Sequence, residues 1–371
     1  MKGLTEWKLA EHRCMNEVVM HRCKEKKENK DSRKKADWKL VFLLAVFLFA
    51  VLLSGCAQSE KKSDQKKSIR IGVSLYRAED TFINNIRTEL EESAKVYEQE
   101  NGIKVTLDIQ FAKGNQNTQN NQVERFISLG CDVLVINPVD RTAASAIIDK
   151  AMTAGIPTIF FNRQPVEEDM NRWDQLYYVG ADAKQGAVLE GKIVADQYHK
   201  DPASIDRNGD GVVRYVLLEG ESSHQDSLIR TEWSIQTLKD TGVPIEKVTG
   251  GIANWERSQA SALMEQWLEQ YPGEIELVVS NNDDMALGAI DAIDRAGVYG
   301  ITLVGIDATT AGMDAVHSGK MLGTVSSDKK AYAGVIMKLA AAKALGEKIP
   351  ENMKLDNGKY YWAEQKIFIE K

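Results

Sequence analysis

The sequence predicts an α/β protein with two domains. From Ile69 onward, short apolar runs alternate with amphipathic segments, which is the order expected of β-α units on parallel sheets. The chain has 371 residues, of which 43% are hydrophobic, so it can build more than one core. Polar side chains follow the ends of most predicted strands, where open α/β sheets bind their ligands. We therefore expect a ligand site assembled from several strand ends.

The predicted strands are short and apolar, and segments with a helical period separate them. The strands are IRIGVSLY, KVTLDI, DVLVIN, TIFF, YYVG, RYVLLEG, ELVVSNN and TLVGID, with GGIAN as a further strand-like segment. The predicted helices cover Ile83–Glu98, Ala143–Ala154, Lys184–His199, Arg257–Leu268 and Met285–Ala296.

Residues 1–55 are typical of a secretory signal peptide. The uncharged apolar run Leu40–Leu53 follows a basic stretch, and Met15 or Met20 are alternative start sites. The run ends in Leu53-Ser54-Gly55-Cys56, which is similar to the lipobox of bacterial lipoproteins and implies that Cys56 is diacylated. A signal anchor that stays as a transmembrane helix is the alternative, but the run is short for that. Residues 56–68 then form a polar tether, so we expect an extracytoplasmic protein, lipid-anchored to the cell membrane.

Cysteine usage and charge exclude two classes of protein. Behind the signal peptide only Cys56 and Cys131 remain, so no disulfide framework is expected. Residues 56–371 carry 35 Lys and Arg against 47 Asp and Glu. This acidic balance argues against a nucleic-acid partner.

The strand ends deliver side chains that suit a sugar. Carboxylates accept hydrogen bonds, Arg donates them, and Asn does both, while aromatic rings can cover the C–H faces of a pyranose. Taken singly, the polar residues could equally cap helices and the aromatic residues could belong to the core, but their joint placement favours a binding site. The candidate residues are Asp80, Phe82, Asn137, His224, Asp226, Arg230, Trp255, Asn282 and Asp307.

These segments resemble a known family. RIGVSLYRAEDTF, VINPVD, FFN, YYVGAD, DRNGDGVVRYVLLEGESSHQD, NWERSQA, VVSNNDDMALGA and VGIDA are similar to the periplasmic galactose/glucose-binding proteins of ABC transporters. The resemblance implies the type I periplasmic-binding fold, in which two doubly wound parallel-sheet domains are joined by a three-stranded hinge. It assigns 69–157 and 328–358 to an N-terminal lobe, and 158–327 and 359–371 to a C-terminal lobe.

The resemblance also implies a role for each site residue. Phe82 and Trp255 would sandwich the sugar, and Asp80 would accept from the 4-hydroxyl, at which glucose and galactose differ. Asn137 would bind near the 6-hydroxyl. The remaining contacts would be Asp226 and Arg230 at the anomeric end and His224, Asn282 and Asp307 at the 2- and 3-hydroxyls. One further family contact, an Asn, is replaced here by Ser327, whose shorter side chain implies a lost or water-mediated contact.

The segment 206–214 alternates oxygen-bearing side chains and then turns at Gly211, as calcium loops do. It is not an EF-hand, because position twelve is Leu217 and a strand follows. The resemblance implies five calcium ligands, namely Asp206, Asn208, Asp210, the Val212 carbonyl and Glu276. The family's last loop ligand is a Gln, but here it is Arg214, and a guanidinium cannot ligate a cation. Calcium binding and its replacement by a salt bridge from Arg214 to Asp206 or Glu276 both remain open.

The resemblance implies a monomeric, lipid-anchored receptor that binds galactose or glucose by hinge closure and delivers it to an ABC permease. A sugar receptor for a sensor kinase or chemoreceptor is the alternative, and nothing in the chain discriminates the two. A glycosidase using a pair among Asp80, Asp226 and Asp307 is disfavoured, because the sequence has no GxSxG, HExxH or phosphate-binding glycine loop. A repressor of the same fold is disfavoured because an export signal stands in place of a DNA-binding head.

Overall fold

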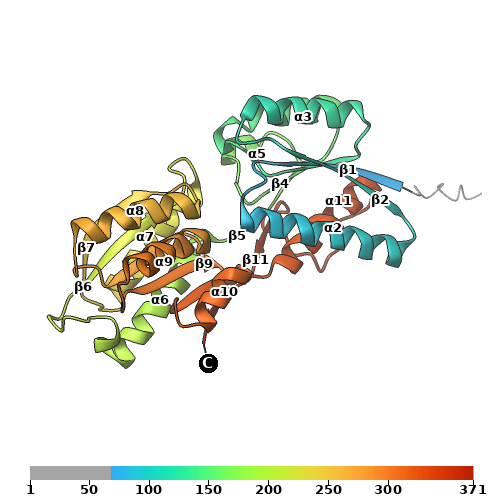
Figure 1. The fold of residues 1–371 in the computed structure, drawn as a ribbon. Coiled ribbons are helices and arrows are strands. Elements are labelled where there is room, and N and C mark those ends of the chain that lie inside the picture. Colours follow the sequence, from blue (N-terminus) through green and yellow to red (C-terminus); the bar gives the residue numbers. More distant parts are fainter. Residues whose placement is uncertain (1–67, 371) are drawn as a thin grey trace, which may run out of the picture. The chain divides into compact units, whose positions relative to one another are not determined.

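The computed structural model describes residues 68–370 (Figure 1). The predicted signal peptide, the lipobox with Cys56 and nearly all of the tether lie outside the described residues. Within the described range, no helix is both long and apolar enough to cross a membrane.

The first sheet has six parallel strands in the order β11-β5-β4-β3-β1-β2. Adjacent residues of its central strand point to opposite faces: Val133 and Val135 belong to one core cluster, and Leu134 and Ile136 to another. Both faces are therefore covered, as in a doubly wound sheet. The strands are β1 (Ser68–Leu75), β2 (Lys104–Phe111), β3 (Val133–Ile136), β4 (Thr158–Phe161), β5 (Leu176–Ala181) and β11 (Tyr360–Ala363).

The second sheet also has six strands, in the order β12-β10-β9-β8-β6-β7, and only its edge strand β12 runs antiparallel to its neighbour. Two core clusters again cover its two faces, one around Val216 and Val278 and the other around Leu217 and Val279. The strands are β6 (Val213–Glu219), β7 (Ile245–Ile252), β8 (Leu277–Ser280), β9 (Thr302–Asp307), β10 (Gly323–Ser327) and β12 (Gln365–Ile369).

Each sheet carries its own helices, and we call a sheet with its helices a lobe. The first lobe contains α2 (Thr81–Asn101), α3 (Gln116–Ser128), α4 (Ser145–Ala154), α5 (Glu167–Met170) and α11 (Lys329–Ala344). The second contains α6 (Ala183–Lys200), α7 (Gln225–Asp240), α8 (Arg257–Gln270), α9 (Asp283–Ala296) and α10 (Thr310–His317). Figure 1 shows α2 and α11 against the first sheet, and α6 and α9 against the second.

The chain passes between the lobes three times. It leaves the first sheet after β5, returns after β10, and passes once more between β11 and β12. The crossing residues are Asp182, Asp328 and Glu364, each one position beyond a strand. The three-stranded hinge and the two-lobed parallel fold implied by the sequence are thus confirmed.

The sheet pairing corrects the predicted lobe boundaries. We expected 158–327 and 359–371 in the second lobe, but β4, β5 and β11 all belong to the first sheet. The strand TIFF pairs with β3 on one side and β5 on the other, so the chain cannot cross until Ala181. Residues 158–181 and the strand Tyr360–Ala363 therefore belong to the first lobe.

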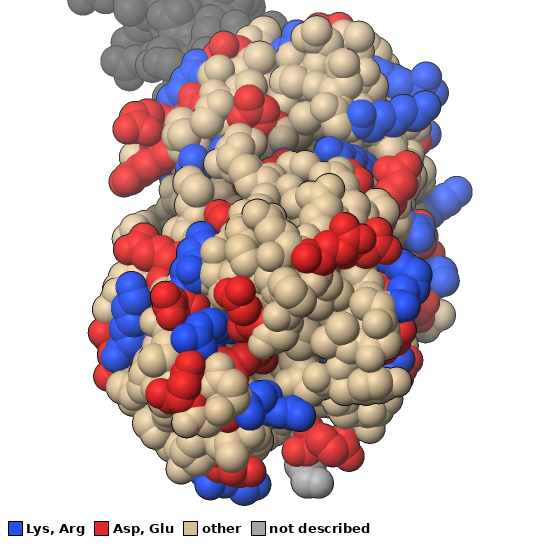
Figure 2. All heavy atoms as spheres, turned by 60° about the vertical axis from the view of Figure 1, so that its left-hand side comes forward, with Lys and Arg blue, Asp and Glu red and all other residues tan. Residues whose placement is uncertain are grey.

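Acidic and basic side chains are interspersed on the face drawn in Figure 2. No broad basic patch is seen on this face.

Candidate functional site

Strand ends of both lobes deliver side chains to one cavity. Eight of the ten predicted sugar contacts line it, and Asn137 and Ser327 do not. Three residues that were not predicted line it as well, namely Tyr76, Asn162 and Arg163. The eight predicted residues are Asp80, Phe82, His224, Asp226, Arg230, Trp255, Asn282 and Asp307.

The first lobe contributes Asp80 and Phe82 from the start of α2. Asp80 is the N-cap of that helix: its Oδ1 accepts from Ile83 N at 2.8 Å, and its Oδ2 accepts from the Tyr76 hydroxyl at 2.5 Å. The Phe82 ring stands edge-on to Tyr332, with ring centroids 6.3 Å apart. Both side chains are therefore fixed by local contacts before any ligand binds.

The second lobe contributes three residues from the start of α7. His224 caps the helix, and its Nδ1 accepts from Asp226 N at 3.1 Å. Burial lowers the pKa of His224 well below its usual range, and the nearby guanidinium of Arg163 adds to this. The neutral ring therefore carries its proton on Nε2, which is left as a donor. One turn further, Arg230 Nη2 lies 3.5 Å from Asp226 Oδ2.

Arg230 lies between two buried carboxylates. Its Nη1 is 3.7 Å from Asp307 Oδ1 and also donates to the carbonyl of Asn281 at 2.8 Å. Burial raises the pKa of Asp226 and raises that of Asp307 well above its usual range, while the Arg230 charge opposes both effects. The triad is a fixed array of acceptors and donors, as recognition of hydroxyl groups requires.

The Trp255 ring packs directly on the backbone of Gly220. A Cβ at Gly220 would lie 2.2 Å from the ring, so only glycine fits beneath it. The ring also meets His224 edge-on, with centroids 5.1 Å apart. Asn282 caps α9 and donates to the Trp255 carbonyl at 3.4 Å, which ties the loop to the helix.

The amide that faces the cavity from the first lobe is Asn162, not Asn137. Asn137 is fully buried one layer behind: its Oδ1 accepts from Tyr76 N, and its Nδ2 donates to Phe161 O and to Asn162 Oδ1. Every hydrogen-bonding group of that side chain is thus used within the protein. Asn162 directly follows β4, so the rule that strand ends carry ligand residues would have identified it.

Ser327 ends β10 and is 5% exposed, but it does not line the cavity. Its hydroxyl accepts from Gln365 Nε2 at 3.5 Å. The structure thus places Ser327 next to the hinge and outside the lining of the cavity.

Arg163 was missed by the sequence reasoning although it also follows β4. Its guanidinium lies over the Tyr76 ring at 3.8 Å and donates through Nη1 to Val139 O and Glu221 Oε2. Glu221 belongs to the second lobe, so this ion pair joins the two lobes. Arg77 of the first lobe makes similar pairs with Glu221 at 3.5 Å and Glu256 at 2.7 Å.

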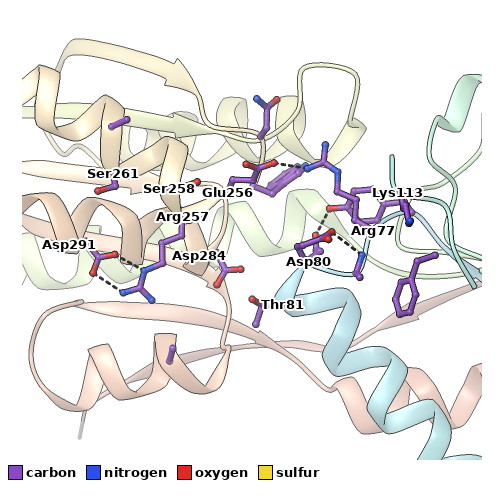
Figure 3. A pocket seen from close by; sticks show the side chains of 18 of the residues that line it. Arg77, Asp80, Thr81, Lys113, Glu256, Arg257, Ser258, Ser261, Asp284 and Asp291 are labelled. Carbon is purple, nitrogen blue, oxygen red and sulfur yellow. Dashed lines mark hydrogen bonds and ion pairs between the residues drawn. The ribbon is translucent and has the colours of Figure 1, made fainter. Parts of the chain in front are cut away.

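The cavity is narrow and lies beside a large cleft. Its volume is about 30 Å³, whereas the neighbouring cleft has about 1300 Å³, and Tyr76, Asp80 and Trp255 line both. Figure 3 shows the cleft, with Arg77 and Glu256 pointing toward each other and Arg257 toward Asp291. A volume of 30 Å³ holds about one water molecule, so the lobes or the lining side chains must move before a larger ligand can enter.

Three buried donors that belong to lining residues have no hydrogen-bond partner among the described residues. They are Arg163 Nε, Arg230 Nε and Trp255 Nε1. An unpartnered buried donor costs about 1–3 kcal/mol, so the site is poised to donate to acceptor oxygens of a ligand. Together with the carboxylates it can satisfy both sides of a hydroxyl group.

In the loop 206–214, the carboxylates expected to bind calcium accept hydrogen bonds from backbone N–H groups. Glu276 Oε1 accepts from the backbone N–H groups of Arg207 and Asn208, and its Oε2 accepts from that of Arg214. Asp206 accepts from the N–H groups of Gly209 and Gly211.

The positive charge of the Arg214 side chain opposes the binding of a cation in this loop. Its Nη1 lies 2.6 Å from Asp210 Oδ2, and its Nε lies 3.6 Å from Glu246. One of the two alternatives was a salt bridge from Arg214 to Asp206 or Glu276, but the guanidinium pairs with Asp210 and Glu246 instead. Any ion bound to Asp210 would lie beside this guanidinium, so the residues present do not fit calcium.

A family comparison agrees with the fold. The model of the periplasmic binding protein domain matches residues 71–348. The chain belongs to the periplasmic binding protein family. The periplasm lies outside the cytoplasm, so membership of this family confirms the expected extracytoplasmic location.

Individual family members are similar over most of their length. The D-galactose/methyl-galactoside binding periplasmic protein MglB of Haemophilus influenzae is 34% identical over 313 residues, which cover 84% of this chain and 91% of the relative. A putative rhizopine-binding protein of Rhizobium meliloti is 30% identical and covers 81% and 91%. A solved ABC transporter solute binding protein from Bacillus halodurans with bound myo-inositol is 30% identical, has a TM-score of 0.68 and covers 83% and 96%. These relatives are named as binding proteins, which confirms the expectation of a binding protein rather than an enzyme.

Proposed function

We propose that this protein captures D-galactose or D-glucose between its lobes and delivers it to an ABC permease. The observation that carries the proposal is that eight residues expected to contact a hexose, drawn from both lobes, line one cavity. The similarity to the galactose-binding protein of Haemophilus influenzae supports the choice of sugar. Hinge closure follows from the three crossings, since ligand contacts from both lobes favour the closed state.

A cyclic polyol is the second candidate ligand. The relative from Bacillus halodurans has bound myo-inositol, which presents a hydroxyl at every ring position. The unpartnered Arg163 donor supports this candidate, because it adds a cationic N–H to a cavity that already has Arg230. Asp80 is in addition engaged with Tyr76, which limits what it can accept from a 4-hydroxyl.

Isothermal titration of the full-length protein in detergent with D-galactose, D-glucose, β-methylgalactoside, D-ribose and myo-inositol tests the proposal. We expect saturable binding of galactose or glucose, accompanied by a change in Trp255 fluorescence. If myo-inositol bound more tightly than either hexose, the proposed ligand would be the polyol and not the hexose. Heat from none of these compounds would refute both.

The lipid anchor and the oligomeric state belong to the same proposal. We expect a monomer held at the membrane by diacylated Cys56. Cells fed an alkynyl fatty acid should label the wild-type protein but not the Cys56→Ser variant. Labelling of the variant would show that the acyl chain lies elsewhere.

We also propose that Arg214 replaces calcium in the loop 206–214. The supporting contact is the 2.6 Å ion pair with Asp210, which supplies positive charge where a cation would otherwise lie.

A further inference from the structure

The backbone at the end of β9 adopts an unusual conformation. Asp307 has a φ of 119° and Ala308 a φ of 44°, although neither is glycine. L-amino acids seldom adopt positive φ, so neighbouring groups must hold this turn in place. The turn matters because Asp307 presents its carboxylate to the cavity.

The second lobe holds the N–H groups of the turn. Ala308 N donates to Thr324 Oγ1 at 3.2 Å, and Thr309 N donates to Asp283 Oδ2 at 2.8 Å. The Thr324 hydroxyl in turn donates to Asp283 Oδ1 at 2.6 Å. One buried carboxylate thus organises this side of the turn.

The carbonyl groups of the turn are held from the other lobe. Lys329 Nζ donates to Asp307 O at 2.7 Å and to Ala308 O at 2.9 Å. Lys329 is the first residue of α11, which packs against α2 and the first sheet. It follows the crossing residue Asp328, so it reaches back across the hinge. Its charge also lies near the Asp307 carboxylate, where it counters the rise in the pKa of Asp307 that burial causes.

We propose that Lys329 is a positioning residue that couples the hinge to ligand binding, by fixing the turn that presents Asp307. This proposal rests on the proposed function, in which Asp307 contacts the ligand. Lys329 moves with α11, so a hinge rotation that moves α11 away from β9 strains its two hydrogen bonds to the turn without removing them. The turn is therefore held most firmly, and the Asp307 carboxylate is best placed for the ligand, when the lobes are closed.

A double-mutant cycle with Asp307 tests the coupling. Titration of the full-length protein with D-galactose and with myo-inositol should show affinity about tenfold weaker in Lys329→Met. The exposed neighbour Lys330→Met is the matched control and should bind as the wild type does. In an Asp307→Asn background, Lys329→Met should weaken binding less than twofold further, because its effect passes through that carboxylate. A full tenfold loss in that background would overturn the proposal, and so would unchanged affinity in Lys329→Met alone.

A second measurement needs no ligand. Amide hydrogen exchange in the ligand-free protein should be at least fivefold faster at Ala308 and Thr309 in Lys329→Met, and unchanged in Lys330→Met. The Lys329→Arg variant, which keeps charge and N–H donors, should restore most of the protection. If the wild type bound none of the sugars or polyols, the proposed function would fail, while the exchange rates would still decide whether Lys329 holds the turn. Equal exchange in all variants would refute it.

Discussion

Arg163 Nη1 and Glu221 Oε2 lie 2.8 Å apart, although one residue follows β4 of the first sheet and the other follows β6 of the second. Their side chains are only 5% and 15% exposed. Burial alone would lower the pKa of Arg163, but its hydrogen bond to Glu221 raises the value overall. The pair therefore contributes to closure as a largely desolvated contact between the lobes.

Glu221→Gln should destabilise the closed state. The substitution removes the charge that both Arg163 and Arg77 face, so we expect affinity to fall about tenfold, mainly through faster release. Stopped-flow tryptophan fluorescence measures that rate. Asp294→Asn, which breaks the half-exposed pair with Lys320, is the control and should change nothing. An unchanged release rate in Glu221→Gln would mean that the pair plays no part in closure.

Loss of either partner of the buried pair in α7 should abolish useful binding. Asp226→Ala removes one of the two buried carboxylates that hold Arg230, and Arg230→Ala leaves both carboxylates without the guanidinium that they share. Each loss costs about 2–5 kcal/mol, so affinity should fall at least about 30-fold by calorimetry. Cys131→Ser should leave affinity unaltered, because this residue belongs to a core cluster of the first lobe and does not line the cavity. Near-normal binding by both α7 variants would show that Asp226 and Arg230 do not contribute to ligand binding.

Arg214→Gln should create a calcium site. The wild-type protein, stripped with a chelator, should give no heat with calcium and no change in melting temperature. In the variant a neutral carbonyl replaces the guanidinium beside Asp210, so heat and a rise in melting temperature are expected.

Arg207→Gln is the matched control for that experiment. It lies in the same loop, but its guanidinium contacts the Gly300 carbonyl rather than a carboxylate. We expect it to behave as the wild type does. Calcium binding by the wild-type protein would contradict the replacement of the ion by Arg214.

Glu190 should make stability fall with rising pH. Burial raises its pKa from 4.5 to about 8, although the Ser234 hydroxyl donates to Oε2 at 2.5 Å. The folded protein holds this proton more tightly than the unfolded chain, so stability is full below about pH 4.5 and is lost up to about pH 8. The loss is at most about 5 kcal/mol.

Glu190→Gln should therefore flatten the dependence of melting temperature on pH between 5 and 8. Calorimetry of both proteins across that range measures it. The exposed Glu92→Gln serves as control, since its partner Lys95 is also exposed. If the melting temperature of Glu190→Gln fell with pH as steeply as that of the wild type, another group would be responsible for the titration.

The rule that ligand residues follow the ends of parallel strands predicted most residues of the site, because it depends only on their position in the sequence. Residues that cap helices α2, α7 and α9 also face the cavity, and that double role is visible as a polar residue between a strand and a helical pattern. The rule failed where two neighbouring strands are both followed by Asn, because it selected Asn137 and passed over Asn162. Asn137 and Asn162 both end parallel strands of the first sheet, and only tertiary packing shows which of them is covered by the other.

Other elements left too weak a signal in the sequence. The helix α3 is rich in Asn and Gln, so its apolar stripe is reduced to Val123 and Phe126. Gln119 and Gln122 are buried instead and form hydrogen bonds with Ser74, and a search for hydrophobic periodicity does not detect such a contact. The short strands β11 and β12 cannot be assigned to different sheets from their sequences, because only one residue separates them.

The three crossings of the hinge also constrain how the chain can be divided. Each lobe is assembled from separated stretches of polypeptide, so no single cut, deletion or domain fusion isolates one lobe with its sheet complete. Replacing the second lobe by that of a relative would require the transplant of Asp182–Ser327 together with strand β12. Such a chimera would have to match its recipient at Asp182, Asp328 and Glu364.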